Sequence, residues 1–206
     1  MKIFGSICLM AVVLVALIGC SKPPEQEISA AISALEAARS AEAELYVRNA
    51  YNMAQDTLNT AMAAKKEQDG KFALFRSYSK SKNMLIRAKT LAEEATVAAQ
   101  AEKERYRMEV ANLITQVQAR LEAVEAEVAK APVGKGNKAD IELIKNDLSA
   151  TKAAFDDARK DNDAGKYISA KSKLEVVMKK ADAISNEIAT ATARKQPTKA
   201  PAKAPR

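Results

Sequence analysis

The sequence predicts an all-α protein of long, alanine-rich helices that pair as antiparallel hairpins in a coiled-coil-like bundle. Hydrophobic residues make up 48% of the 206 positions but aromatic residues only 4%, and alanine, the best helix former, supplies much of the apolar content. The six Gly and six Pro cluster at a few places and leave long stretches for helices. Apolar residues recur at spacings of three and four, and no alternating run typical of strands is present.

The first 19 residues are expected to be an export signal. Lys2 gives a short positive start, and an apolar run covers residues 7–18. This run is shorter than the roughly 20 residues that a membrane-spanning helix needs, so it fits the hydrophobic region of a signal peptide better than a permanent anchor. Residues 20–27, which include Pro23-Pro24, are expected to form a short tether.

The apolar run ends in Leu17-Ile18-Gly19-Cys20. These four residues resemble the lipobox of bacterial lipoprotein precursors. The resemblance implies cleavage between Gly19 and Cys20, a diacylglycerol on the Cys20 thiol and an N-acyl chain on the new amine, with no other cofactor. Two or three acyl chains give stable anchoring, whereas one chain gives only marginal binding. An uncleaved anchor, or an ordinary signal with a chance cysteine, is the alternative.

The residue after the cysteine bears on the membrane that holds the protein. In many Gram-negative lipoproteins an Asp at that position retains the protein at the inner membrane, and here the residue is Ser21. The resemblance therefore implies the outer membrane, with the body of the protein in the periplasm. A Gram-positive host would instead place the protein on the surface of its plasma membrane.

Residues 28–131 are expected to form a long helical hairpin. The first helix starts near Glu25 and meets its first break at Gln68-Asp69-Gly70, where Gly70 suits the left-handed capping position. The second helix starts near Phe72 and runs to Pro132, with a bend near residues 101–107 as an alternative to one straight helix. The expected stripes are Ile28, Ile32 and Leu35; Val47, Tyr51, Ala54, Leu58 and Ala61; Tyr78, Ser81, Leu85, Ala88, Ala92, Ala95 and Ala99; and Tyr106, Val110, Leu113, Val117, Leu121, Val124 and Val128.

A Pro/Gly linker at residues 132–138 precedes a second helical hairpin at residues 139–192. Its two stripes are Ile141, Ile144, Leu148, Thr151, Phe155 and Ala158, then Tyr167, Ala170, Leu174, Val177, Ala181, Ile184, Ile188 and Ala191. A turn that contains Gly165 separates them. Two similar stripes joined by a short turn predict antiparallel helices.

Residues 193–206 are expected to be a disordered basic tail. This segment has three prolines and no large apolar residue, so it cannot bury enough surface to fold. It holds five cations and no acid: Arg194, Lys195, Lys199, Lys203 and Arg206. The net charge of +7 is therefore concentrated here. We expect these cations either to contact an anionic surface or to act only as a soluble terminus.

The two helix–turn–helix stretches resemble each other. Tyr78 is followed by Ser81 and Leu85, and Tyr167 is followed by Ala170 and Leu174 at the same offsets. The pattern favours an internal repeat over chance similarity between Ala/Lys-rich helices. Residues 28–105 also resemble a helical domain of unknown function that is common in Gram-negative envelope lipoproteins, with Ser81 in place of its usual alanine. That resemblance implies a helical envelope protein with no established activity.

The residue inventory argues against an enzyme and against a metal centre. The chain has no His, so it lacks an imidazole base and any His-containing catalytic or zinc site. Cys8 falls in the expected signal and Cys20 carries the expected lipid, so no thiol remains. No residue is therefore predicted to be catalytic or to bind a metal.

Three functions remain open. The leading hypothesis is a non-enzymatic structural or interaction protein of the cell envelope, which contacts the cell wall, a protein partner or a second copy and no nucleic acid. The second is a covalent peptidoglycan tether that resembles the small helical major lipoprotein of enteric bacteria. That protein is attached through a C-terminal lysine, whereas this chain ends in Arg206, with Lys203 three residues inside. The third is a helical carrier or chaperone for an apolar ligand or peptide, with an exposed apolar strip at Val110–Val128.

Overall fold

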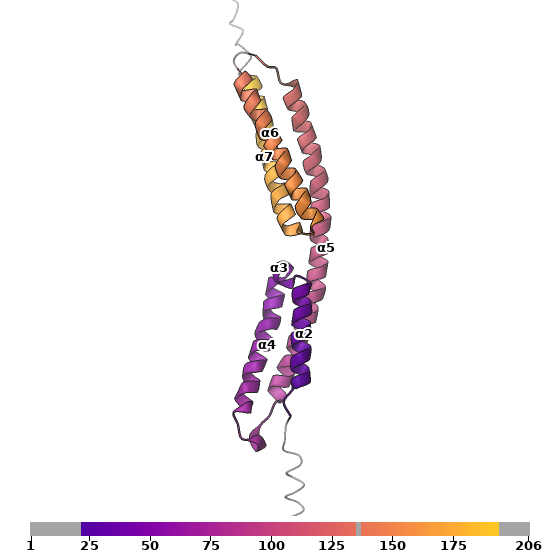
Figure 1. Ribbon diagram of the computed structural model, residues 1–206, viewed down its shortest axis with the longest axis vertical. Helices are drawn as coiled ribbons and strands as arrows, with labels where there is room; N and C mark the ends of the chain where they lie inside the picture. The colour runs from indigo at the N-terminus through magenta and orange to yellow at the C-terminus, as the bar shows by residue number, and fades with distance from the viewer. Residues whose placement is uncertain (1–21, 135–136, 194–206) are drawn as a thin grey trace, which may run out of the picture. The chain divides into compact units, whose positions relative to one another are not determined.

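The computed structural model describes residues 22–134 and 137–193 (Figure 1). Within these residues there are six α-helices, one short 3₁₀ helix and no strand, which confirms the predicted all-α fold. The chain divides into two units, Met1–Lys103 and Glu104–Arg206. The helix α5 (Ser79–Lys130) belongs to both, because its first part packs in one unit and its second part in the other.

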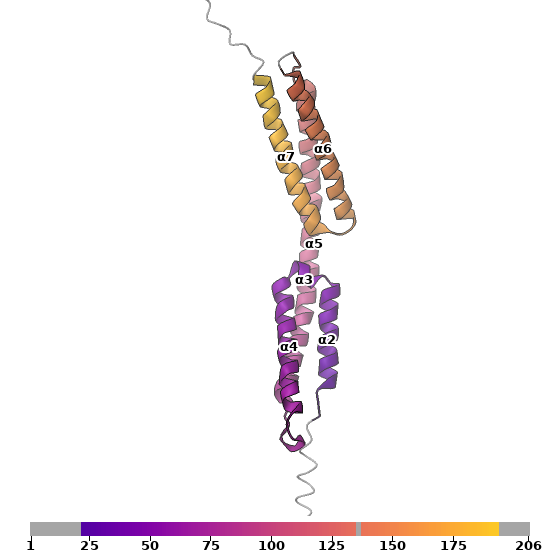
Figure 2. The same cartoon turned by 60° about the vertical axis from the view of Figure 1, so that its left-hand side comes forward.

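The first unit is a three-helix bundle. Helices α2 (Glu25–Ser40) and α4 (Arg48–Asp69) lie beside the first part of α5 in both views (Figures 1 and 2). Most of the side chains between these helices are alanines, with Leu85 and Tyr51 among the few large ones. Alanine lets helices approach closely but buries little apolar area per residue. The predicted α4 and α5 positions from Tyr51 to Ala99 are all buried.

The predicted stripe of α2 is wrong at one position. Ile32 is 40% exposed, whereas Ala31, Ala34 and Ala38 are buried together with Ile28. Ile32 was predicted at a contact position because its side chain is large and apolar. In a closely packed alanine bundle, the small residues take the contact positions and an isoleucine is left at the edge.

The first break in the helical chain comes earlier than predicted. The helix α2 ends at Ser40, and a single-turn helix, α3 (Ala43–Tyr46), separates it from α4. No Gly or Pro marks this turn. Glu42 adopts the left-handed conformation, with φ of 62°, and its carboxylate lies 2.9 Å from the Lys103 ammonium of α5. The turn thus depends on tertiary contacts, which a search for helix breakers cannot detect.

The connection between α4 and α5 also differs from the prediction. Residues 70–78, here called the 70–78 loop, contain the 3₁₀ helix η1 (Ala73–Phe75), and α5 begins at Ser79 rather than near Phe72. Gly70 does not adopt the predicted left-handed conformation, because its φ is −73°. The glycine that does is Gly165, with φ of 73°, in the turn between α6 and α7.

The second unit packs the rest of α5 against the hairpin of α6 (Lys138–Asp163) and α7 (Tyr167–Ala193). The two helices of the hairpin are antiparallel, as predicted (Figure 2). Every predicted stripe position of α6 is buried, and those of α7 are buried from Ala170 to Ala191. The core here is built from Val, Ile, Leu and Phe more than from Ala.

The division between the units falls within α5, not at the predicted linker. Helix α5 is continuous through residues 101–107, but none of its side chains between residues 100 and 109 is buried. The linker does exist between α5 and α6. It is ordered at one point by buried Asn137, whose side chain accepts from the Gly134 amide and donates to the Pro132 carbonyl, each at 2.8 Å.

Candidate functional site

The residues that carry the predicted anchor and the basic tail lie outside the described residues. These are Gly19 and Cys20 at one end, and Arg194, Lys195, Lys199, Lys203 and Arg206 at the other. Their predicted roles therefore stay predictions. On the N-terminal side, the described residues begin at Lys22 and lead directly into the first unit.

The tether is shorter than the predicted residues 20–27. Pro24 is already buried, and its carbonyl accepts from the Ile28 amide at 3.0 Å in the first turn of α2. Proline is well suited to the start of a helix because it lacks the amide hydrogen that would have no partner there. Residues 25–27 are helical. The path of the chain is thus fixed from Pro24 onward.

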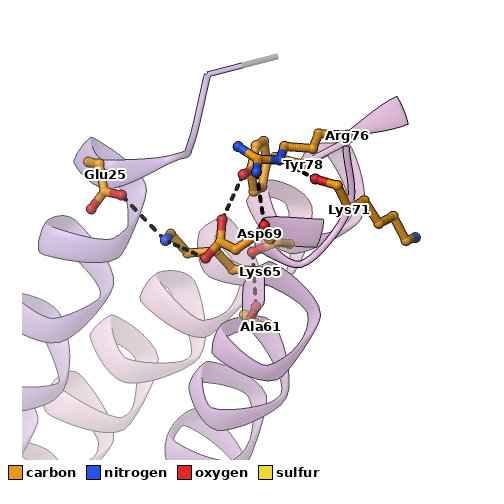
Figure 3. A network of polar contacts seen from close by, with 8 residues as sticks. Glu25, Ala61, Lys65, Asp69, Lys71, Arg76 and Tyr78 are labelled. Carbon is orange, nitrogen blue, oxygen red and sulfur yellow. Dashed lines mark hydrogen bonds and ion pairs between the residues drawn. The ribbon is translucent and has the colours of Figure 1, made fainter. Parts of the chain in front are cut away.

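The start of α2 is joined to the end of α4 by ion pairs (Figure 3). The Lys65 ammonium lies 3.0 Å from the Asp69 carboxylate and 3.5 Å from that of Glu25. Two residues further along α2, Glu27 lies 2.8 Å from Lys82 of α5. These contacts place the first residues of α2 and the 70–78 loop at the same end of the first unit.

Asp69 is the central residue of this network. Its carboxylate accepts from the Tyr78 hydroxyl at 2.6 Å and also pairs with Lys65. The hydrogen bond from Tyr78, followed by that from Lys65, lowers the pKa of Asp69. The same bond raises the pKa of Tyr78, because removing its proton would bring two negative oxygens together. Asp69 therefore stays ionised and Tyr78 stays protonated at neutral pH.

The backbone of the 70–78 loop is also held by side chains. The Arg76 guanidinium donates to the carbonyls of Lys71 at 2.8 Å and Asp69 at 2.9 Å, as Figure 3 shows. The Ser77 amide donates to the Gln68 side chain at 3.1 Å. Behind the loop, the buried Ser81 hydroxyl donates to the Ala61 carbonyl of α4 at 2.9 Å. The loop is thus closed onto the helix ends by named polar contacts.

The outer side of the same loop is apolar. Phe72, Leu74 and Phe75 are here called the apolar tip. These residues are 69%, 60% and 76% exposed, and the centroids of the two phenyl rings lie 6.3 Å apart. Sequence reasoning placed Phe72 at the start of a helix and assigned no role to Leu74 or Phe75. The signal that could have revealed them is a cluster of large apolar residues next to a glycine in a chain otherwise poor in aromatics.

The apolar strip that the carrier hypothesis requires is not exposed. Val110, Val117, Leu121, Val124 and Val128 expose 7% or less and pack against α6 and α7. A surface hollow of about 370 Å³ lies between α6 and α7 and is lined in part by Asp140, Asp147 and Glu187. None of the residues of the expected apolar strip lines this hollow.

Two further properties concern the described residues only. In residues 22–134 and 137–193, no three His, Cys, Asp or Glu side chains gather where they could hold a metal ion. Over the same ranges, no helix combines the length and the apolar character needed to cross a membrane.

Comparison of the chain with family models, with curated proteins and with solved structures finds no match. The resemblances to the lipobox and to the helical envelope domain therefore stay predictions that depend on the quoted residues.

Proposed function

We propose that this protein is a bacterial lipoprotein that is held in a membrane by acyl chains on Cys20 and acts in the cell envelope as a non-enzymatic structural or interaction protein. The observation that carries the proposal is the order of features at the N-terminus. The chain begins with a cation and continues with an apolar run of signal length. This run ends in Leu17-Ile18-Gly19-Cys20, after which the chain becomes polar. Two or three acyl chains on one residue suffice for stable anchoring.

The short distance along the chain between the cysteine and the first helix supports the proposal. Only four residues separate Cys20 from Glu25, where α2 begins. The bundle of the first unit is therefore held close to any membrane that binds Cys20. The large apolar residues of the second unit are mostly buried in its own core, so the polar outer faces of the helices are the surfaces available to partners.

The inventory of side chains supports a non-enzymatic role. The chain has no histidine, and its two cysteines lie in the proposed signal and at the proposed lipid site. The carboxylates whose pKa is lowered include Asp69, Glu27, Glu109 and Asp161. Each is paired with a lysine or hydroxyl in a contact that joins helices or closes a turn. Such pairs serve the fold and need no catalytic explanation.

The outer membrane is the proposed location, with the body of the protein in the periplasm, because Ser21 is the residue after Cys20. The basic residues 194–206 are proposed to contact anionic groups of the cell wall or of a membrane surface. This contact would weaken as salt is added, because charges exposed to water are screened within about 10 Å at 0.1 M salt.

A single substitution tests the anchor. The Cys20→Ser variant should accumulate as an unprocessed precursor that incorporates no labelled acyl chain, whereas the wild-type protein is shortened and labelled. Cys8→Ser is the matched control, because it removes the other cysteine and should leave processing and labelling unchanged. Normal labelling and processing of the Cys20→Ser variant would contradict the proposal.

A further inference from the structure

The apolar tip is not needed to close its hairpin. The second unit offers a direct comparison, because Tyr78 and Tyr167 stand at the start of equivalent helices. Leu58 and Leu148 are matching positions before these two tyrosines, because Leu58 lies 20 residues before Tyr78 and Leu148 lies 19 before Tyr167. Helix α4 ends at Asp69, 11 residues after Leu58, whereas α6 ends at Asp163, 15 residues after Leu148. The α6–α7 connection is then only residues 164–166. About one helical turn of α4 is thus replaced by the longer 70–78 loop, which carries the apolar tip.

The exposure of the apolar tip results from an ordered loop. Arg76 bonds to two backbone carbonyls, Tyr78 bonds to Asp69, and Ser77 bonds to Gln68. These polar groups face the helix ends, and the rings of Phe72 and Phe75 remain outside. Exposed large apolar residues that are grouped on one feature are typical of an interaction site.

The tip lies at the end of the unit where the chain arrives from Cys20. Lys65 contacts both Glu25 of α2 and Asp69 next to the loop. The five residue steps from Cys20 to Glu25 reach at most about 18 Å, even when fully extended. A membrane that holds the acyl chains of Cys20 is therefore near the 70–78 loop.

The charges around the tip fit an anionic lipid surface. Residues 65–82 contain six cations and two acids, Glu67 and Asp69. Glu25 and Glu27 of α2 pair with Lys65 and Lys82 at the same end, so these residues together carry a net charge of +2. The cations are Lys65, Lys66, Lys71, Arg76, Lys80 and Lys82. Apolar side chains flanked by Lys and Arg are the combination that binds the interface of a bilayer, with the rings among the acyl chains and the cations at the headgroups.

We propose that Phe72, Leu74 and Phe75 insert into the interface of the same phospholipid bilayer that holds the acyl chains of Cys20. This inference rests on the proposed function, and it adds a second point of attachment. Attachment at Cys20 alone would leave undetermined which surface of the first unit faces the membrane. Two attachments fix which end of the unit meets the membrane.

Tryptophan fluorescence can test this insertion, because the chain has no Trp. The lipidated, processed Phe75→Trp protein is reconstituted in vesicles of phosphatidylethanolamine and phosphatidylglycerol, with and without brominated acyl chains. We expect emission at shorter wavelengths than in water and strong quenching by the brominated lipid. The control is Leu45→Trp, because Leu45 is 56% exposed in α3 at the other end of the same unit. Its emission should stay at long wavelength and be unaffected by bromine.

The intact mass of the same samples separates the two proposals. If Cys20 is acylated and the tryptophan at position 75 is exposed to water, the insertion of the tip is contradicted and the anchor is not. A blue-shifted emission that brominated lipid does not quench would mean that a second copy or another protein covers the tip, and this result also overturns the inference. An unmodified Cys20 contradicts the proposed function, and the inference fails with it.

Discussion

At the residue scale, two buried hydroxyl groups lie among the apolar side chains of the cores. Ser81 and Thr151 are 1% and 2% exposed, and each donates to a backbone carbonyl. Thr151 bonds within its own helix, to Asp147 at 2.6 Å. Ser81 bonds to Ala61 on a different helix, so it both keeps α4 and α5 close and fixes their relative position along the axis. Ala170 occupies the equivalent position in the second unit and is fully buried.

Substitutions at Ser81 separate the hydrogen bond from the small volume. Ser81→Ala keeps the close approach and should lower the free energy of unfolding by about 1 kcal/mol, the net value of one hydrogen bond. Ser81→Val adds volume between closely packed helices and should cost about 1–3 kcal/mol more. Urea unfolding followed by circular dichroism measures both. Equal stabilities for the two variants would show that the helices are not closely packed at this point.

Asp69 should make the fold sensitive to acid. The folded state lowers its pKa below the ordinary value of 3.8, so the ionised carboxylate stabilises the fold above that pH. The stabilisation is lost as the pH falls through the lower, folded-state pKa. Asp69→Asn should therefore reduce the melting temperature at pH 7. Between pH 5 and pH 2, the melting temperature of this variant should fall less than that of the wild-type protein. Asp56→Asn, at an exposed position of the same helix, is the control. If the melting temperature of the Asp69→Asn variant fell with acid as much as that of the wild-type protein, the lowered pKa of Asp69 would be contradicted.

The burial of side chains in regular helices was predicted well, whereas the roles of residues in turns were not. The predicted burial of Ser81, Leu85 and Ala88 in α5 is confirmed, because helical periodicity is a local property of the chain. The role of Asp69 was missed, since its partners Tyr78 and Lys65 become neighbours only when the loop folds back. Glu42 was missed for a similar reason, because Lys103 is far from it in sequence.

At the scale of elements, the two hairpin connections are built differently. The α6–α7 turn is short and requires a left-handed residue, which Gly165 supplies. The α4–α5 connection is longer, and Gly70 there has ordinary helical angles. The sequence led to the opposite assignment for Gly70, because a glycine at the end of a helical pattern most often marks a left-handed cap.

Alanine substitutions at these two glycines should have opposite effects. Gly165→Ala forces a side chain into the left-handed region and should destabilise the protein by about 1–2 kcal/mol. At Gly70 a Cβ would come no closer than 3.7 Å to its nearest neighbour, the Glu67 carbonyl oxygen. Gly70→Ala should therefore stabilise the protein by about 0.4–1 kcal/mol, since it restricts the unfolded chain. Thermal unfolding measures both, and a destabilised Gly70→Ala variant would contradict the backbone geometry.

At the scale of the whole molecule, one helix belongs to two cores. Prolines and glycines mark places where the chain leaves a helix, so the sequence suggested a boundary at residues 132–138. They do not mark places where a helix passes from one core to another. That boundary is visible in the sequence only as the charged stretch near residues 101–107, where none of the side chains is buried.

The segment between the cores should be the least protected part of α5. Residues 100–109 have no buried side chain, whereas Ala95, Ala99, Val110 and Val117 are fully buried on either side. Amide hydrogens exchange through local opening where few apolar contacts hold the helix. We expect exchange at residues 102–108 to be at least about tenfold faster than at residues 88–98 and 112–124. Uniform protection along α5, measured by mass spectrometry of peptides, would contradict the division into two cores.

We propose above all that acyl chains on Cys20, the first residue of the processed protein, anchor this protein in a membrane. The most direct measurement is the intact mass of the wild-type protein extracted from membranes, together with fragmentation of its N-terminal peptide. We expect a chain that begins at Cys20, lacks residues 1–19 and carries a diacylglycerol and an N-acyl group on that cysteine. A chain that retains residues 1–19, or one with a free thiol at Cys20, would contradict it.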